Sequence, residues 1–169
     1  MDTTSEIRLQ AVNPTLAAKV RLVDAEFQRE TGDDHLEVVQ GLRNYAEQLR
    51  LWSIGRKQQD DGTWVVVNES LVVTQAPPGY SWHEFGLADD PVPRSLLPIK
   101  GWCPESPLWA TMARIAQSYG LVVGACWHHK DLPHVQLTGR FPVSPDDEVR
   151  QLFQQGGLQA VWDAAQIET

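Results

Sequence analysis

The sequence contains few cysteines. Only Cys103 and Cys126 occur among its 169 residues, and they do not have CxxC spacing. Two cysteines are too few for a disulfide framework or a cysteine-rich zinc site, so both of these ways of stabilising a small protein are excluded. We expect both residues to be free thiols buried in the interior.

Long hydrophobic runs are also missing. No segment approaches the roughly 18 consecutive apolar residues that a transmembrane helix needs. The opening residues MDTTSEIRLQ lack a basic stretch followed by an apolar one, so we predict no signal peptide. We therefore expect a protein that is made in the cytoplasm and is not inserted into a membrane. To act outside the cytoplasm it would have to be released by another agent.

Basic residues are in deficit. The chain has 14 Lys and Arg residues against 22 Asp and Glu residues, which gives a formal net charge of −8. Nucleic-acid binding requires a basic face that neutralises phosphates, so this charge balance argues against nucleic acid as a partner.

What remains is the composition of a soluble domain, with 42% hydrophobic and 21% charged residues. We expect one domain over residues 1–169, of α+β class, in which a small antiparallel sheet is flanked by helices. Ser144 is the expected N-cap of the C-terminal region. The predicted helices cover 13–32, 44–57, 106–120 and 144–167, the last as one or two helices, and the predicted strands cover 36–41, 121–127 and 134–139.

Two short phrases outside the predicted helices pair a histidine with an aspartate. SWHEFGLADD contains His83 and Asp90, and DLPH contains Asp131 and His134. A catalytic zinc site commonly has three protein ligands and one open position, and hydrolysis also needs a free carboxylate to carry a proton. The two phrases supply His83, Asp90 and His134 as ligands and Asp131 as the free carboxylate.

The local sequence leaves alternatives open. Asp89 competes with Asp90 as a ligand, and spacing alone does not decide between them. We interpret the adjacent histidines His128 and His129 as rim residues. Seven tryptophans are many for this length, and we expect Trp82 and Trp127, which flank the two phrases, to line a cleft.

Four ordered motifs resemble those of the VanY-like zinc peptidases. This family includes D-alanyl-D-alanine carboxypeptidases and the L-alanyl-D-glutamate endopeptidases of phage lysis, with the Hedgehog/DD-peptidase fold. The resemblance covers roughly residues 40–137, which we take as the catalytic part. The motifs are GLRNYAEQLRLWSIGR (41–56), VTQAPPGYSWHEFGLADD (73–90), GLVVGACW (120–127) and DLPHVQ (131–136).

The resemblance implies a role for individual residues. It implies zinc as cofactor, with ligands at His83, Asp90 and His134, and so selects Asp90 over Asp89. It implies Asp131 as general base and Arg43 as the group that polarises the scissile carbonyl. The expected substrate-binding residues are Ser81, Gln48 and Trp127.

The sequence departs from the family pattern in three places. Glu84 replaces the usual asparagine after the first histidine, and we expect it to add a negative charge beside the site. The interval from Trp127 to Asp131 is a residue shorter than the pattern. The proline-rich segment 91–108 is less similar to the family.

The expected function is zinc-dependent hydrolysis of an amide in the stem peptide of peptidoglycan. We expect a monomeric L-alanyl-D-glutamate endopeptidase that acts as a phage-type endolysin after holin-type release. One alternative is a D-alanyl-D-alanine carboxypeptidase, which would use Arg94, Lys100 or Lys130 to bind the terminal carboxylate. Another is a non-catalytic, zinc-stabilised module that binds the cell wall.

Overall fold

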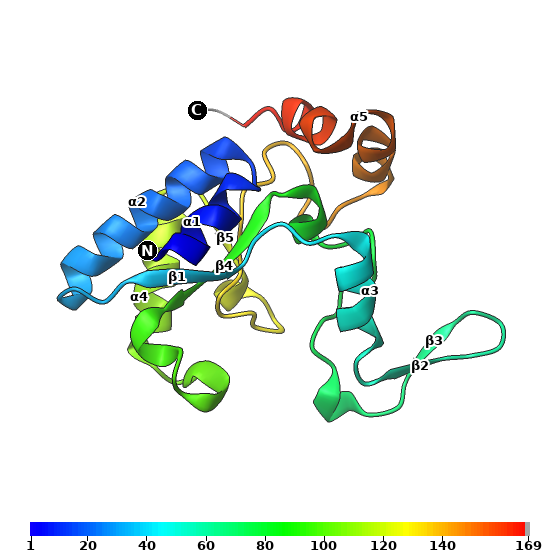
Figure 1. The fold of residues 1–169 in the computed structure, drawn as a ribbon, viewed down its shortest axis with the longest axis horizontal. Helices are drawn as coiled ribbons and strands as arrows, with labels where there is room; N and C mark the ends of the chain where they lie inside the picture. Colours follow the sequence, from blue (N-terminus) through cyan, green and yellow to red (C-terminus); the bar gives the residue numbers. More distant parts are fainter. Residues whose placement is uncertain (168–169) are drawn as a thin grey trace.

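The computed structural model describes residues 1–167. Within them lie five α-helices and two small antiparallel sheets, which confirms the predicted α+β class. Figure 1 shows the four-stranded sheet at the centre of the molecule, with α1, α2 and α4 beside it. The helices are α1 (Thr3–Gln10), α2 (Pro14–Thr31), α3 (Tyr45–Ser53), α4 (Pro107–Ser118) and α5 (Asp147–Ala165). The strands are β1 (Leu36–Gln40), β2 (Arg56–Gln58), β3 (Trp64–Val66), β4 (Ala88–Pro93), β5 (Val122–Val123) and β6 (Val135–Gln136).

The main sheet has the order β1-β4-β6-β5, and neighbouring strands are antiparallel. β4 is therefore an inner strand with a partner on each side. Gln40 of β1 lies opposite Asp90, and Val135 of β6 lies opposite Asp89. The main hydrophobic core joins residues of the sheet to α2 and α4, and it includes Val20, Phe27, Leu36, Val92, Met112, Ile115 and Val135.

The helix ends show where sequence signals succeeded and where they failed. α2 begins as predicted, because the Asn13 side chain accepts hydrogen bonds from the first-turn amides and Pro14 occupies the first helical position. The prediction for Ser144 was wrong: the last helix begins at Asp147, and its cap is Asp146, which accepts from the Val149 amide at 3.1 Å. α5 is kinked at Gly156 and Gly157, which have non-helical dihedral angles.

Three further expectations need correction. Helix α1 was not predicted, because only Ser5 and Leu9 are buried in it and no apolar period is visible. The predicted strands 121–127 and 134–139 each shrink to two residues, since the chain turns into a 3₁₀ helix at Gly124–Cys126. Both cysteines are free thiols as expected, but Cys126 is exposed and Cys103 is half-buried.

A projecting segment, residues 54–77, is called the arm below. It carries the β2–β3 hairpin, which extends away from the body of the molecule in Figure 1. The arm is tied at its root by Arg56, whose guanidinium donates to the carbonyls of Trp52 (2.8 Å) and Thr74 (3.0 Å) and lies 3.5 Å from the Trp52 ring centroid. None of the helices within residues 1–167 is long and apolar enough to cross a membrane.

Candidate metal centre and active site

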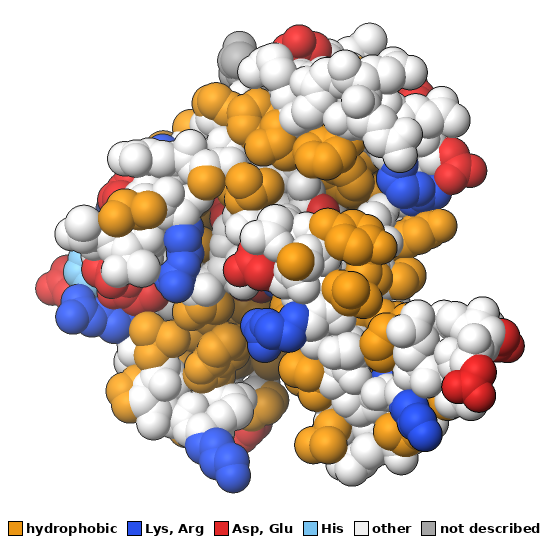
Figure 2. All heavy atoms as spheres, turned by 45° about the vertical axis from the view of Figure 1, so that its right-hand side comes forward, with side chains coloured by type: hydrophobic (Ala, Val, Ile, Leu, Met, Phe, Trp, Pro, Cys, Tyr) orange, Lys and Arg blue, Asp and Glu red, His pale blue; other side chains and the backbone are white. Residues whose placement is uncertain are grey.

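A cleft of about 880 Å³ opens between the body of the molecule and the arm. Figure 2 shows a notch in the surface at this place. The cleft is lined from the body by His83, Asp90, Trp127, Asp131 and His134, and from the arm by residues 72–77. It is the feature that brings together the two histidine-containing phrases, which lie far apart in the sequence.

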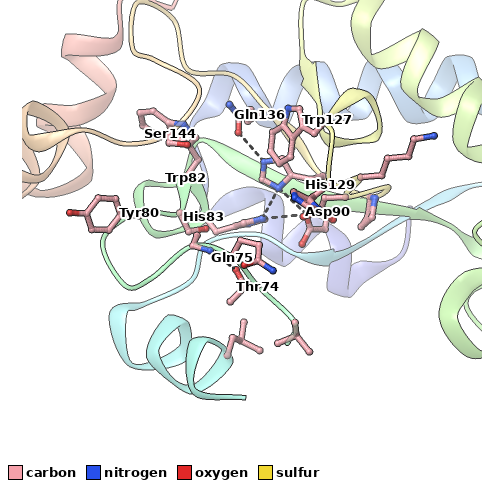
Figure 3. A pocket seen from close by; sticks show the side chains of 18 of the residues that line it. Thr74, Gln75, Tyr80, Trp82, His83, Asp90, Trp127, His129, Gln136 and Ser144 are labelled. Carbon is pink, nitrogen blue, oxygen red and sulfur yellow. Dashed lines mark hydrogen bonds and ion pairs between the residues drawn. The ribbon is translucent and has the colours of Figure 1, made fainter. Parts of the chain in front are cut away.

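At the floor of the cleft, three side chains converge on one point (Figure 3). His83 comes from the 3₁₀ helix Trp82–Phe85, Asp90 from β4, and His134 from the residue before β6. Asp90 Oδ1 lies 3.3 Å from His83 Nε2 and 3.4 Å from His134 Nδ1, and the two ring nitrogens are 3.2 Å apart. The antiparallel pairing of Asp89 in β4 with Val135 in β6 brings the next residue of β4, Asp90, close to the residue before β6, His134.

The outer nitrogen of each imidazole fixes its tautomer. His83 Nδ1 lies 2.9 Å from the Gly41 carbonyl, and His134 Nε2 lies 3.0 Å from Gln136 Oε1. The amide of Gln136 is itself oriented, because its Nε2 donates to the Val143 carbonyl at 3.0 Å. Both outer nitrogens therefore carry a proton, and in the neutral rings that bind metals the two inner nitrogens present lone pairs to the centre.

This arrangement fits a divalent cation. Two imidazole lone pairs and a carboxylate face one another, and Asp90 Oδ1 is buried without a hydrogen-bond partner among the described residues. Burial would raise the pKa of Asp90, but the positive charge of His83 and His134 in their protonated forms, and the hydrogen bonds that these rings then donate, hold it well below its usual range. Two imidazoles and one carboxylate form a ligand set that suits zinc, and metal-binding histidines usually donate a hydrogen bond from the outer ring nitrogen, as both do here.

Asp89 and Asp90 lie on opposite faces of β4, because side chains alternate along a strand. Asp89 is 0% exposed, and its carboxylate has no hydrogen-bond partner among residues 1–167. It lies beside Gly41, where an added Cβ would come within 3.0 Å of Asp89 Oδ1. Burial and the charge of Asp90 raise the pKa of Asp89 well above its usual range. The structure therefore brings Asp90, and not Asp89, to the two histidines.

Asp131 lies in the wall of the cleft near the cluster. Its pKa is raised, first by burial within the cleft and then by the negative charge of Asp90. Its loop is held by Gly124, whose carbonyl accepts from the Asp131 amide at 3.1 Å and whose amide donates to the His134 carbonyl at 2.8 Å. A Cβ at position 124 would lie 2.5 Å from the Asp131 carbonyl oxygen, so the glycine permits this close approach.

Arg43 is buried beside the cluster and lines the cleft. One guanidinium nitrogen donates to Gln48 Oε1 at 2.7 Å, and another lies 4.0 Å from Asp90 Oδ2. Its Nε has no hydrogen-bond partner among the described residues. The backbone amide of Arg43 donates to the His83 carbonyl at 3.0 Å, which couples the position of the arginine to that of the histidine.

The three expected substrate-binding residues differ in their placement. Ser81 and Trp127 line the cleft, and the Trp127 ring lies 4.9 Å from the His134 ring. Gln48 is 0% exposed and lies behind Arg43, with its amide nitrogen donating to the Ala76 carbonyl at 2.7 Å. Gln48 is therefore placed to orient Arg43 and does not line the cleft.

Glu84 does not add its charge to the cluster as expected. Its carboxylate turns away and accepts hydrogen bonds from the backbone amides of Gly79 (2.8 Å) and Ser81 (3.3 Å). Of the cations considered for a substrate carboxylate, Lys130 lines the cleft, whereas Arg94 and Lys100 do not. In Figure 3, Tyr80 lies on one side of His83 and His129 on the other, so the cleft continues in both directions from the cluster.

The two groups that contact the outer nitrogens of the histidines were not predicted from the sequence. The Gly41 carbonyl carries no side-chain signal. Gln136 did carry one, because a residue two positions after His134 on a strand points to the same face. It belongs to the motif DLPHVQ, but the resemblance implied no role for it.

A histidine–aspartate–histidine cluster beside a spare carboxylate and a buried arginine, in an α+β fold, is the arrangement of a hydrolase with a candidate metal centre. The family model VanY, described as D-alanyl-D-alanine carboxypeptidase, matches residues 10–133. The chain belongs to this family, and it is on this ground a peptidase of the class that acts on peptidoglycan. The match contains His83, Asp90 and Asp131 and ends one residue before His134. No curated protein matches the chain.

Proposed function

We propose that the protein is a zinc-dependent peptidase that cleaves the stem peptide of peptidoglycan as an L-alanyl-D-glutamate endopeptidase. The observation that carries this proposal is the convergence of two imidazole lone pairs and the Asp90 carboxylate at the floor of a cleft, beside Asp131. Residues 1–167 would form one catalytic domain. The biological role we propose is that of a phage-type endolysin released to the wall by a holin.

Zinc bound by His83, Asp90 and His134 would lower the pKa of a water molecule and polarise the scissile carbonyl. Asp131 would accept a proton from the attacking water and then give it to the departing amine. Burial and the charge of Asp90 raise the pKa of Asp131 in the protein without metal, and the charge of a bound cation would oppose this rise.

Arg43 would donate hydrogen bonds to the oxygen that becomes negative during attack. A buried guanidinium stabilises such charge strongly because little water competes, and the unpartnered Nε–H of Arg43 is available as a donor. Gln48 would hold the guanidinium in place through its 2.7 Å contact, so that no reorientation is needed during the reaction.

The shape of the cleft supports internal cleavage. Lining residues continue from the cluster toward Tyr80 and Ser144 on one side and toward His129 on the other, so a substrate can extend past the reacting bond in both directions. Terminal D-alanyl-D-alanine cleavage is the second candidate, because Lys130 lines the cleft and would bind a terminal carboxylate, and because the family model carries that description.

The proposal is tested by measuring metal content and peptidoglycan cleavage together. We expect about one zinc per chain and soluble stem-peptide fragments from the wild-type protein, and neither from His83→Ala. His35→Ala removes a histidine outside the cleft and serves as the matched control, which should keep both properties.

Mass spectrometry of the products distinguishes the candidates. Fragments with a new amino-terminal D-glutamate indicate the endopeptidase, and loss of a single alanine indicates the carboxypeptidase. Stoichiometric zinc without cleavage of any wall preparation would instead favour a wall-binding module. Absence of zinc from the wild-type protein would refute the proposed site.

A further inference from the structure

A turn in the segment that departs from the family pattern has an unusual backbone. Gly101, Trp102 and Cys103 all have positive φ angles, of 72°, 54° and 46°. Bulky L-residues rarely adopt the left-handed region, and such strain persists only where the surrounding structure enforces it. The turn is therefore a candidate for a functional role.

Trp109 enforces the turn. It is 3% exposed, and its indole Nε1 lies 3.2 Å from both the Trp102 and the Cys103 carbonyl oxygens, to which it donates. The Cys103 carbonyl also accepts from the Ser106 amide at 2.9 Å, at the start of α4. Trp102 packs in part against the main core and also lines the cleft. The strained turn thus fixes a tryptophan in the cleft wall.

The arm side of the cleft also contributes hydrophobic side chains. Leu51 at the end of α3 and Val72 and Val73 of the arm line the same cleft as Trp102, and Val73 is 59% exposed. Figure 2 shows hydrophobic surface on both sides of the notch between the body and the arm. We call Trp102, Leu51, Val72 and Val73 the apolar slot. None of the four has a role in the proposed hydrolysis.

We infer that the apolar slot binds the aliphatic side chain of the diamino acid in the stem peptide, so that Trp102 determines specificity. This inference rests on the proposed function. In the proposed L-alanyl-D-glutamate cleavage the diamino acid is the second residue on the carboxyl side of the cleaved bond. In D-alanyl-D-alanine cleavage it is the second residue on the amino side, so the inference applies to the endopeptidase.

The chemistry of the walls favours this occupant over a sugar ring. Sugar hydroxyls that lose water need hydrogen-bond partners, and the four side chains of the slot offer only the indole N–H. A chain of methylene groups needs no such partners, and its charged end can remain in water. Each methylene withdrawn from water strengthens binding by about fourfold.

The test combines changes in the enzyme with changes in the substrate. Synthetic stem peptides carry lysine, norleucine or alanine at the diamino-acid position, and kcat/KM is measured for each. Trp102→Gly removes the ring but keeps a residue that adopts positive φ, and Cys103→Gly is the matched control in the same turn.

For the wild-type enzyme we expect lysine and norleucine peptides to be cleaved with similar kcat/KM, roughly 60-fold above the alanine peptide, because each buries three further methylene groups. Trp102→Gly should abolish this preference while leaving the alanine peptide unaffected, and Cys103→Gly should keep the preference. A loss of activity that is equal for all three peptides would mean that Trp102 acts only through folding, and would overturn the inference. An unchanged preference in Trp102→Gly would also overturn it.

Binding to an inactive protein separates failure of the slot from failure of the proposed reaction. Titration calorimetry with Asp131→Asn measures peptide affinity without turnover. If wild-type protein cleaves no peptide but Asp131→Asn still prefers lysine over alanine through Trp102, the slot stands and the proposed activity fails. If cleavage occurs without that preference, the activity stands and the slot fails.

Discussion

The floor of the cleft and the arm that forms its wall are built in opposite ways. On the floor, each imidazole is held by a hydrogen bond on its outer nitrogen, and Asp90 belongs to a strand that is paired on both sides. The arm has a two-stranded hairpin with exposed valines, and Arg56 and Ala76 hydrogen-bond it to Trp52 and Gln48 of α3.

This difference separates two tasks. Binding a cation requires donors held to within fractions of an ångström, and a buried, cross-linked floor supplies that precision. Contact with a variable substrate requires exposed side chains whose exchange does not disturb the core, and the arm supplies these. We therefore expect matched substitutions on the floor and on the arm to have very different effects.

The largest contrast is expected between two aspartates. Asp131→Asn should lower kcat by about a thousandfold, because the amide cannot accept the proton of the attacking water. Its zinc content should be unchanged, since Asp131 is not part of the ligand cluster. Asp60→Asn, the same change at an exposed position of the arm, should leave kcat unaltered. Steady-state kinetics and metal analysis of the two variants check this, and full activity of Asp131→Asn would reject the general base.

A second contrast is expected between two glutamines. Gln136→Leu removes the acceptor that orients His134 and should weaken zinc affinity by roughly 10- to 100-fold. Gln58→Leu on the arm removes only an exposed contact with the Gly62 carbonyl and should not change zinc affinity. Competition with a chelator of known affinity measures both. Equal affinities for the two variants would show that the outer hydrogen bond does not matter.

Asp89 should make the stability of the floor dependent on pH. In the unfolded chain its pKa lies near the ordinary value of about 4, whereas burial raises its pKa well above that in the folded protein. Above pH 4 the unfolded state therefore binds fewer protons at this residue than the folded state, and stability falls as pH rises through the folded pKa. The favourable contribution is fully present only below about pH 4.

Replacing Asp89 with asparagine should remove the contribution of this residue to the pH dependence of stability. In thermal melts between pH 5 and 8, with chelator present to exclude metal binding, Tm should fall less with pH in Asp89→Asn than in the wild-type protein. Asp60→Asn should follow the wild-type curve. A wild-type slope in Asp89→Asn would show that Asp89 is already ionised in the folded protein throughout this range.

The smallest effect on global stability is expected for Arg56→Ala. Loss of two charged hydrogen bonds and a stacking contact should destabilise the arm by about 1–3 kcal/mol. Global Tm should change little, because neither hydrophobic core cluster of the described residues includes a residue of β2 or β3. Hydrogen exchange should show faster opening of β2 and β3 only, and the exposed neighbour Lys57 gives a control as Lys57→Ala. A large drop in Tm would mean that the arm folds together with the core.

Much of the fold was predictable, because its signals are local. Asn13 with Pro14 and Gly32 mark the ends of α2, and the family motifs lie in the expected order. The terminal helix α1 was not predicted, because only two of its residues, Ser5 and Leu9, are buried and they form no visible apolar period. The strand at 121–127 was predicted too long because a β-branched run does not reveal that Gly124 must turn to meet Asp131.

The candidate site was predictable in its residue types but not in its geometry. Spacing could not choose between Asp89 and Asp90, since the choice depends on which face of β4 meets the cleft. Gln48 matched a motif, but its position behind Arg43 follows from the packing of α3 against residue 76. The sequence did not indicate that Trp102 lines the cleft. Its left-handed conformation depends on tertiary hydrogen bonds from Trp109 to the carbonyls of Trp102 and Cys103.

The attachment of the arm has a consequence for protein engineering. Its two ends, near Trp52 and Thr74, are joined by one guanidinium, and residues 57–72 between them supply no member of the metal cluster. A hairpin of different length and sequence could be grafted at this point. A library of variants with different sequences between these two anchors would vary the substrate range of the enzyme and leave the residues of the metal cluster unchanged.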